Sequence, residues 1–340
     1  MLRAGRRMKV SVIIASYNHE RYVEQAIRSV LAQSFQDFEI ILVDDASTDR
    51  TFEIAQGIRD VRLTCIRAPK NCGTSTTYNT CLAHARGEYV AVLNSDDFFA
   101  PGRLQRQVDL LDAKPGVAAV FSQAQFVDEA GAPYWSLPGG AIGFAAANCS
   151  RHIWLRRFFF EGNQLCHPSV MIRRSVHQDI GLYDFRLIQI HDFDLWIRVC
   201  LKHDIHVLEE PLINFRVRDN QGNANNTKPG TIARITWEYD HVVRRFLEIT
   251  GFDEFAQVFP EVTLPRDEWD MFAQRYALAK LALPVQNVAH ARLGLELLYG
   301  LFGDLGASEV ERRFGLPLDW FLRTTGMPEL IFRHRPGGAA

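Results

Sequence analysis

Four consecutive residues, Asn94-Ser95-Asp96-Asp97, carry the strongest chemical signal in this 340-residue chain. They follow the run 88–93, whose apolar composition predicts a buried strand. Open α/β sheets bind their ligands at the carboxyl ends of strands, which is where these two carboxylates would lie. Hard divalent cations prefer carboxylate oxygens, and substrate phosphates often complete their coordination. The stretch therefore predicts a site for a metal-bound nucleotide diphosphate.

A second acidic pair, Asp44 and Asp45, ends the predicted strand over 38–43. In a parallel sheet, both pairs would lie at the same edge. A single acidic pair at a strand end is more often a turn or a helix cap. Two pairs in one cleft need a cation or hydrogen-bond donors to offset their like charges. Before them, Ser16-Tyr17-Asn18 ends the first strand, and it is either an Asn-containing turn or a cradle for a nucleotide.

Further candidates lie beyond residue 160. Asp192 opens a predicted helix and is either its cap or a general base that accepts a proton from an attacking hydroxyl. His167 precedes a β run and is either structural or functional. Arg216 and Arg218 alternate to one side of a strand, where they either face solvent or clamp a diphosphate with paired hydrogen bonds.

The elements that must position these residues alternate between β and α through residue 122. Strands are predicted over 9–15, 38–43, 61–67, 88–93 and 117–122, and helices over 20–33, 50–57, 74–85 and from Pro101. This order predicts an α/β fold with a mostly parallel central sheet and helices on both faces. Residues 124–165 are irregular and rich in glycine and proline, which predicts an active-site loop or a surface excursion.

The second half adds predicted strands at 169–172, 205–208 and 213–217, and a helix at 192–202. Helices are then predicted over 232–249, 269–283, 289–302 and 309–322. We therefore expect an α/β domain over 8–220, a polar linker over 221–230, a helical C-terminal region over 231–330 and a disordered tail over 331–340. The helical region would serve an acceptor cleft, a dimer contact or a membrane surface, or it would simply pack internally.

Composition excludes several classes of protein. The formal net charge is −2, so no global basic field recruits nucleic acid. The six cysteines show no CxxC spacing, which predicts reduced thiols. No signal peptide or membrane-spanning segment is expected, so the predicted location is the cytoplasm, with association at the inner face of the membrane left open. P-loop, dinucleotide-binding and GxSxG motifs are missing from the sequence.

Together, these ordered motifs resemble those of an inverting family 2 glycosyltransferase with the GT-A fold, the nucleotide-diphospho-sugar transferase fold. The resemblance runs from about Val10 to Arg218. It is carried by the segments 10–18, 29–34, 39–49, 94–97, 167–171 and 191–198. Two positions depart from the family pattern: His191 stands where an acidic residue is common, and Ala46 stands where glycine is common.

The resemblance implies a role for each matching residue. Asp45 would contact the uracil of a UDP-sugar, with Asp44 nearby, and Asp96 would lie near the ribose. Asp97 would ligate Mn²⁺ or Mg²⁺ that bridges the diphosphate. Asp192 would be the base for direct displacement at the anomeric carbon, with inversion. The expected acceptor or diphosphate side comprises His167, His191, Trp196, Arg216 and Arg218.

The expected activity is the metal-dependent transfer of a sugar from a UDP-sugar to a glycan, lipid-linked or other hydroxyl acceptor, as in cell-envelope polysaccharide synthesis. One alternative is a sugar nucleotidyltransferase, which needs a glycine-rich basic loop where residues 16–20 read Ser-Tyr-Asn-His-Glu. Another is a non-catalytic relative that only binds a nucleotide. A homo-oligomer is compatible with each of these activities.

Overall fold

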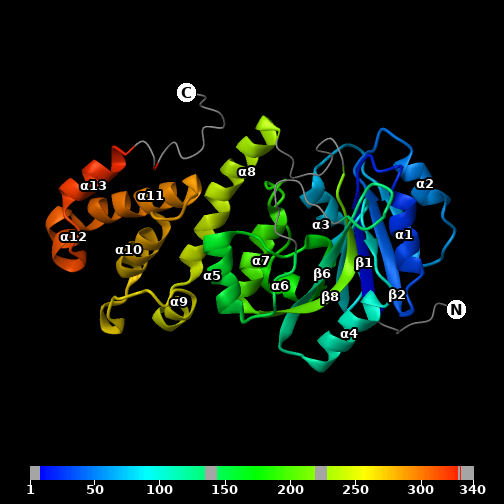
Figure 1. Cartoon of the computed structure of the whole chain (residues 1–340), viewed down its shortest axis with the longest axis horizontal. Coiled ribbons are helices and arrows are strands. Elements are labelled where there is room, and N and C mark those ends of the chain that lie inside the picture. The colour runs from blue at the N-terminus through cyan, green and yellow to red at the C-terminus, as the bar shows by residue number, and fades with distance from the viewer. Residues whose placement is uncertain (1–7, 135–143, 219–227, 328–329, 331–340) are drawn as a thin grey trace. The chain divides into compact units, whose positions relative to one another are not determined.

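The first compact unit of the computed structural model is built on one eight-stranded sheet with the order β3-β2-β1-β4-β7-β6-β8-β5. Among these strands, Figure 1 labels β1, β2, β6 and β8. The structure describes residues 8–134, 144–218, 228–327 and 330. The strands are β1 (Val10–Ser16), β2 (Phe38–Asp44), β3 (Leu63–Arg67), β4 (Tyr89–Asn94), β5 (Phe98–Phe99), β6 (Val117–Val127), β7 (Met171–Arg173) and β8 (Asp204–Arg216).

Strands β3, β2, β1 and β4 are parallel, as the sequence predicts, and the sheet is mixed from β7 onward. β1 pairs in parallel with β2 and β4, and β2 pairs in parallel with β3. β7 then runs antiparallel to both β4 and β6, whereas β6 and β8 are parallel. The carboxyl ends of the first four strands therefore meet at one edge of the sheet.

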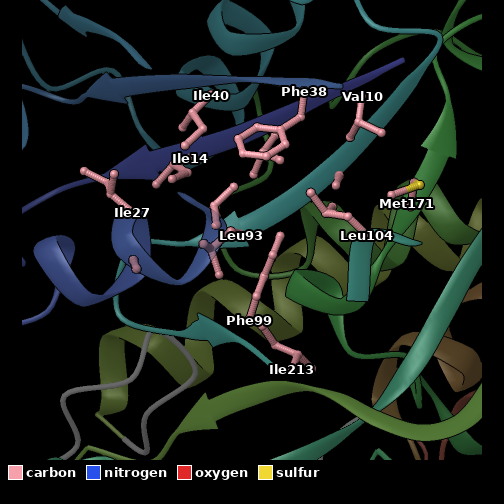
Figure 2. Close-up of a cluster of buried hydrophobic side chains, with 14 of the residues drawn as sticks. Val10, Ile14, Ile27, Phe38, Ile40, Leu93, Phe99, Leu104, Met171 and Ile213 are labelled. Atoms are coloured by element: carbon pink, nitrogen blue, oxygen red, sulfur yellow. The ribbon is translucent and has the colours of Figure 1, made fainter. Parts of the chain in front are cut away.

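Helices cover both faces of this sheet. They are α1 (Val23–Leu31), α2 (Thr51–Gly57), α3 (Thr74–His84), α4 (Arg103–Ala113), α6 (Val176–Ile180) and α7 (His191–Lys202). Alternate residues of β1, including Ile14, pack with Ile27 of α1 and Leu104 of α4 in the core cluster of Figure 2. On the opposite face, α3 lies against β1 and β2, and Cys81 Sγ donates to Ile14 O at 3.6 Å. This alternation is the physical signature of a sheet buried on both faces.

The second compact unit is helical. It contains residues 155–162 and the chain from 227 onward. Its helices are the second part of α5 (Arg151–Glu161), α8 (Pro229–Val242), α9 (Phe252–Val258), α10 (Met271–Ala282), α11 (Val288–Leu305), α12 (Ala307–Phe314) and α13 (Leu318–Thr325). An aromatic cluster with Phe159, Phe246 and Phe259 forms part of its core. Among the described residues, no helix is both long and apolar enough to cross a membrane.

Several elements differ from the sequence prediction. Residues 151–161, expected to be irregular, form α5, because buried Trp154, Leu155, Phe158 and Phe159 supply tertiary packing that local propensity does not reveal. The strands predicted at 205–208 and 213–217 are one strand, β8, with register shifts opposite Gln123. Helix α9 was not predicted. The helix predicted over 309–322 is two, α12 and α13, separated by Gly315 in a left-handed conformation and by Pro317.

The predicted polar linker and tail are only partly described. Residues 221–227 and 331–340 lie outside the described residues, and α8 begins at Pro229, inside the predicted linker. Within the region predicted as an irregular loop, 135–143 also lie outside the described residues.

Candidate functional site

Three strand ends bring the predicted donor-side residues together. Ser16 is the register partner of Asp44, and Ala15 is the register partner of Asn94. The first acidic pair and the 94–97 stretch therefore flank β1 on either side, at the edge where parallel strands end. Ser16 is 2% exposed and Asp44 is fully buried. Ser16 Oγ and Asp44 Oδ1 make no hydrogen bond with any described residue, so this edge contains two buried polar atoms without a partner among those residues.

The two loops that follow β1 and β2 are tied to each other. Asn18 has φ +53° and accepts a hydrogen bond from Thr48 N at 2.8 Å, while Ser47 N donates to Asp44 Oδ2 at 2.9 Å. Ala46 has φ +58°, in the left-handed region that favours glycine, which gives a physical reason for the glycine common in the resembled family. The edge is thus pre-shaped by local hydrogen bonds. Tyr17 is 44% exposed beside it.

Asp45 fastens the loop that enters α3. Its Oδ1 accepts a hydrogen bond from Cys72 N at 2.7 Å, and its Oδ2 accepts one from Gly73 N at 2.9 Å. Both carboxylate oxygens are therefore engaged by backbone, although each keeps a second lone pair.

Asp96 is the carboxylate that meets polar side chains from other elements. Its Oδ2 lies 3.1 Å from Arg218 Nε and 3.9 Å from His19 Nε2. His19 Nδ1 in turn lies 2.7 Å from Ser95 Oγ, and burial lowers the His19 pKa. Asp96 Oδ1 forms no hydrogen bond or ion pair with any described residue. Asp96 therefore keeps one carboxylate oxygen for a ligand.

Asp97 is held differently from its neighbour. Its Oδ1 accepts a hydrogen bond from Arg216 N at 2.7 Å, and its Oδ2 accepts one from Asn94 Nδ2 at 2.9 Å. The side chain is buried, and this burial, with the nearby Asp96 charge, raises the Asp97 pKa well above its ordinary value. The structure thus gives Asp97 the contacts of a residue that joins β4 to β8.

Arg216, expected on the diphosphate side, points its guanidinium at the protein. Nε donates to Asp96 O at 2.8 Å, and Nη1 donates to Asp128 O and Glu129 O at 3.0 and 2.6 Å. Its residue exposure is 1%. Arg216 therefore shapes the loop around Asp96, whereas Arg218, two residues on, lies against the Asp96 carboxylate itself.

Asp192 lies at the start of α7 with its side chain partly exposed. Asn163 Nδ2 donates to Asp192 Oδ2 at 3.0 Å, which orients the carboxylate. Burial raises the Asp192 pKa, and this effect exceeds the opposing effects of His191 and the hydrogen bonds. A carboxylate that is oriented, reachable and more basic than usual has the attributes of a general base.

Aromatic and imidazole side chains pack around His191, the residue before Asp192: its ring centroid lies 5.3 Å from that of His167 and 5.6 Å from that of Tyr183. His167 Nε2 lies 2.9 Å from Tyr183 Oη, and burial lowers the His167 pKa well below its ordinary value. His191 Nδ1 donates to Ile188 O at 3.1 Å. Trp196 is 1% exposed and packs edge-on against Phe121 at 4.7 Å, as a core residue does.

A stacked tyrosine pair connects the acidic edge to Asp192. Tyr78 Oη donates to Asn94 Oδ1 at 2.8 Å. Burial raises the Tyr78 pKa, and the negative charges of Asp96 and Asp97 raise it further. Burial also raises the pKa of Tyr183, and the negative charge of Asp192 raises it further. The Tyr183 ring stacks on the Tyr78 ring, with 5.4 Å between the centroids. The two carboxylate groups are thus near opposite members of one aromatic pair.

The sequence did not predict several residues of this site, among them His19, Tyr78, Asn163 and Tyr183. His19 directly follows the Ser16-Tyr17-Asn18 motif, and its position offers a signal that sequence reading could have used. Tyr78 and Asn163 lie inside a helix and an irregular segment, and only their distant partners identify them.

The residues at Asp96 fit a divalent cation that substrate completes. Among the described residues, no group of three His, Cys, Asp or Glu side chains forms a metal site. Mg²⁺ and similar ions at phosphate-transfer sites need only one or two protein carboxylates, because phosphates and water supply the remaining ligands. The unengaged oxygen of Asp96 meets this requirement.

Comparison with known proteins agrees with this architecture. The model of the family described as "Glycosyl transferase family 2" matches residues 11–181, half of the chain, and ends before Asp192. An uncharacterized glycosyltransferase of Methanocaldococcus jannaschii is 31% identical over 219 residues, 62% of this chain and 72% of the relative. An uncharacterized glycosyltransferase of Rickettsia typhi is 29% identical, over 62% of this chain and 65% of its own length.

Solved structures support the fold over nearly the whole chain. Residues 1–349 of TarS from S. aureus, solved with UDP, are similar with a TM-score of 0.55 at 20% identity, over 91% of this chain and 92% of that chain. The same protein solved with UDP-GlcNAc gives a TM-score of 0.55 at 19% identity. The expected GT-A fold with a helical C-terminal region is confirmed. The chain belongs to glycosyl transferase family 2 and is a glycosyltransferase.

Proposed function

We propose that this glycosyltransferase moves a sugar from a UDP-sugar to a hydroxyl of a glycan or lipid-linked acceptor, with inversion at the anomeric carbon. The observation that carries the proposal is the pairing of an acidic strand edge with Asp192, an oriented and unusually basic carboxylate. Tyr78 connects the two groups: its Oη donates to Asn94 Oδ1 at 2.8 Å, and its ring stacks on that of His191, the residue before Asp192, with 6.1 Å between the ring centroids.

The donor class is supported by likeness and by chemistry. TarS of S. aureus, which shares the fold, has been solved with UDP and with UDP-GlcNAc. In this chain, the orphaned polar atoms of Ser16 and Asp44 lie at the edge where a nucleotide would meet the sheet. A polar nucleobase or ribose would satisfy them.

The cation role fits Asp96 better than Asp97. Both Asp97 oxygens already accept hydrogen bonds, from Arg216 N and from Asn94 Nδ2. Asp96 keeps an oxygen that binds no described residue. We therefore assign the cation contact to Asp96 and a supporting role to Asp97. A bound Mn²⁺ or Mg²⁺ would offset the charge that develops on the departing diphosphate.

Asp192 removes the proton of the acceptor hydroxyl as that oxygen attacks the anomeric carbon. Its raised pKa makes it a stronger base than an ordinary aspartate, while Asn163 fixes the direction of its oxygens. A single base and one displacement invert the configuration. No covalent sugar intermediate is needed.

A donor panel tests the proposal. UDP, GDP, CDP and their common sugar conjugates are each mixed with the protein, with Mn²⁺ and with EDTA, and the melting temperature is recorded. Because a ligand stabilises the folded state in proportion to its occupancy, UDP compounds with Mn²⁺ should give the largest increase. Equal shifts for all nucleotides, or a UDP shift indifferent to EDTA, would contradict the donor or the cation assignment.

A further inference from the structure

One guanidinium is held between two potential metal ligands at the acidic edge. Arg218 Nε lies 3.1 Å from Asp96 Oδ2, and Arg218 Nη1 lies 2.9 Å from His19 Nε2. The two contacted atoms, His19 Nε2 and Asp96 Oδ2, are 3.9 Å apart. All three side chains are mostly buried, with exposures of 17% for Arg218, 16% for His19 and 11% for Asp96. A positive charge thus occupies a small space lined by one nitrogen and one oxygen.

The contact with Arg218 fixes the tautomer of His19. An arginine guanidinium stays protonated and only donates hydrogen bonds, so His19 Nε2 must accept. The ring is therefore neutral with its proton on Nδ1, which donates to Ser95 Oγ at 2.7 Å. The Nε2 lone pair consequently faces the position of the cation.

This arrangement matches how proteins prepare a histidine for a metal. Ligating imidazoles usually donate a hydrogen bond from the other ring nitrogen, which fixes the ring and its tautomer. Imidazole nitrogen and carboxylate oxygen both suit first-row divalent cations such as Mn²⁺. Neighbouring ligands of an octahedral cation with bonds of about 2.1 Å lie about 3 Å apart. The pair therefore needs only a small inward movement to share one ion.

We propose that Arg218 is an internal counter-cation that covers a divalent-cation site formed by Asp96 and His19. The inference rests on the proposed function. It moves the cation contact from the unengaged Oδ1 of Asp96 to its Oδ2, and it adds His19 as a second ligand and Arg218 as the group that the cation displaces. A dication and a guanidinium repel each other strongly at this distance, so the two occupy the site alternately. Displaced, Arg218 becomes available to the diphosphate oxygens that arrive with the cation.

Direct Mn²⁺ binding to the full chain without nucleotide tests this inference, with free Mn²⁺ measured by electron paramagnetic resonance. Arg218→Gln should bind Mn²⁺ about tenfold more tightly than the natural protein, because apparent affinity scales with the fraction of molecules whose site is open. Arg28→Gln is the charge-matched control, since Arg28 pairs with Glu24 on the exposed side of α1. It should leave Mn²⁺ affinity unchanged.

Two further variants distinguish the proposed metal ligands, His19 and Asp96, from Arg218. His19→Asn retains an amide near the position of Nδ1 but lacks Nε2, so adding it to Arg218→Gln should reverse the gain. Asp96→Asn should weaken Mn²⁺ binding in every background. If Asp96→Asn weakens binding but Arg218→Gln does not strengthen it, the counter-cation inference fails alone. If Mn²⁺ binding is indifferent to Asp96, the cation assignment of the proposed function fails as well. Circular dichroism confirms that each variant is folded.

Discussion

At the residue scale, the three carboxylates of the site differ in exposure and in hydrogen-bond partners. Asp97 is buried and joined to the Arg216 backbone, Asp96 keeps an oxygen for a ligand, and Asp192 is oriented by Asn163. Sequence reading located all three, because carboxylates that end apolar runs or begin helices stand out. The family resemblance gave the cation to Asp97 and the ribose side to Asp96, whereas we propose the cation contact for Asp96. The partner behind this change, the Arg216 amide, is 119 residues away from Asp97 in the sequence.

Removing the Asn163 hydrogen bond should shift the pH dependence of catalysis. The Asn163 amide stabilises the charged form of Asp192, so Asn163→Ala should raise the Asp192 pKa further. The base works only when deprotonated, so activity falls as pH falls through this pKa. The acid limb of kcat/KM should therefore move to higher pH, by about half a unit to one unit.

Asn163→Asp provides the matched comparison. It keeps the side-chain oxygen that accepts from Leu165 N but places a second negative charge near Asp192. Its acid limb should move further in the same direction. An acid limb that stays in place, or moves to lower pH, in both variants would show that Asp192 is not the titrating base.

At the element scale, the sequence predicts the first half of the sheet well. Largely apolar runs such as 38–43, in which Glu39 is the one charged residue, predict buried strands, and β2 covers that run as Phe38–Asp44. Prediction fails where packing overrides local signals. Helix α5 follows a glycine-rich stretch and is stabilised by buried aromatic side chains. Strand β8 continues through Pro211, between the two strands that the sequence predicts.

The turn from α3 into β4 depends on glycine at position 87. A Cβ added to Gly87 would lie 2.4 Å from Ser11 N and 2.7 Å from Tyr89 O, both backbone atoms that cannot rotate away. Gly87→Ala should therefore lower the free energy of unfolding by about 2 kcal/mol, the usual cost of overpacking. Gly57→Ala is the control, because a Cβ there meets nothing within 4 Å. Urea denaturation compares the two, and equal stability would refute the close approach.

At the scale of the whole molecule, a helical unit accompanies the α/β unit. The sequence predicts its helical character but neither its core nor its function. Within that core, His290 is 2% exposed and its ring lies 4.8 Å from that of Phe159, whose backbone opposes part of the effect of burial on the His290 pKa. Burial lowers its pKa to about 4.

This buried imidazole should make the helical unit sensitive to acid. In the unfolded chain His290 takes up a proton near pH 6.5, whereas in the folded chain it does so only near pH 4. The contribution of His290 to the free energy of unfolding should therefore be fully present above pH 6.5 and decline as the pH falls toward 4. His290→Phe should flatten this decline in urea unfolding monitored by circular dichroism. His241→Gln, at an exposed position of α8, is the control and should keep it. An unchanged slope in His290→Phe would contradict the assignment.

The central claim is that Asp192 activates the acceptor for transfer from a UDP-sugar, and Asp192→Asn tests it most directly. Transfer or slow donor hydrolysis is measured with the best UDP-sugar and Mn²⁺, alongside UDP affinity by calorimetry. The variant should lose about a thousandfold in turnover, within the range that a general base contributes, while UDP affinity changes less than about threefold. Turnover equal to that of the natural protein, with the same UDP affinity, would contradict the claim.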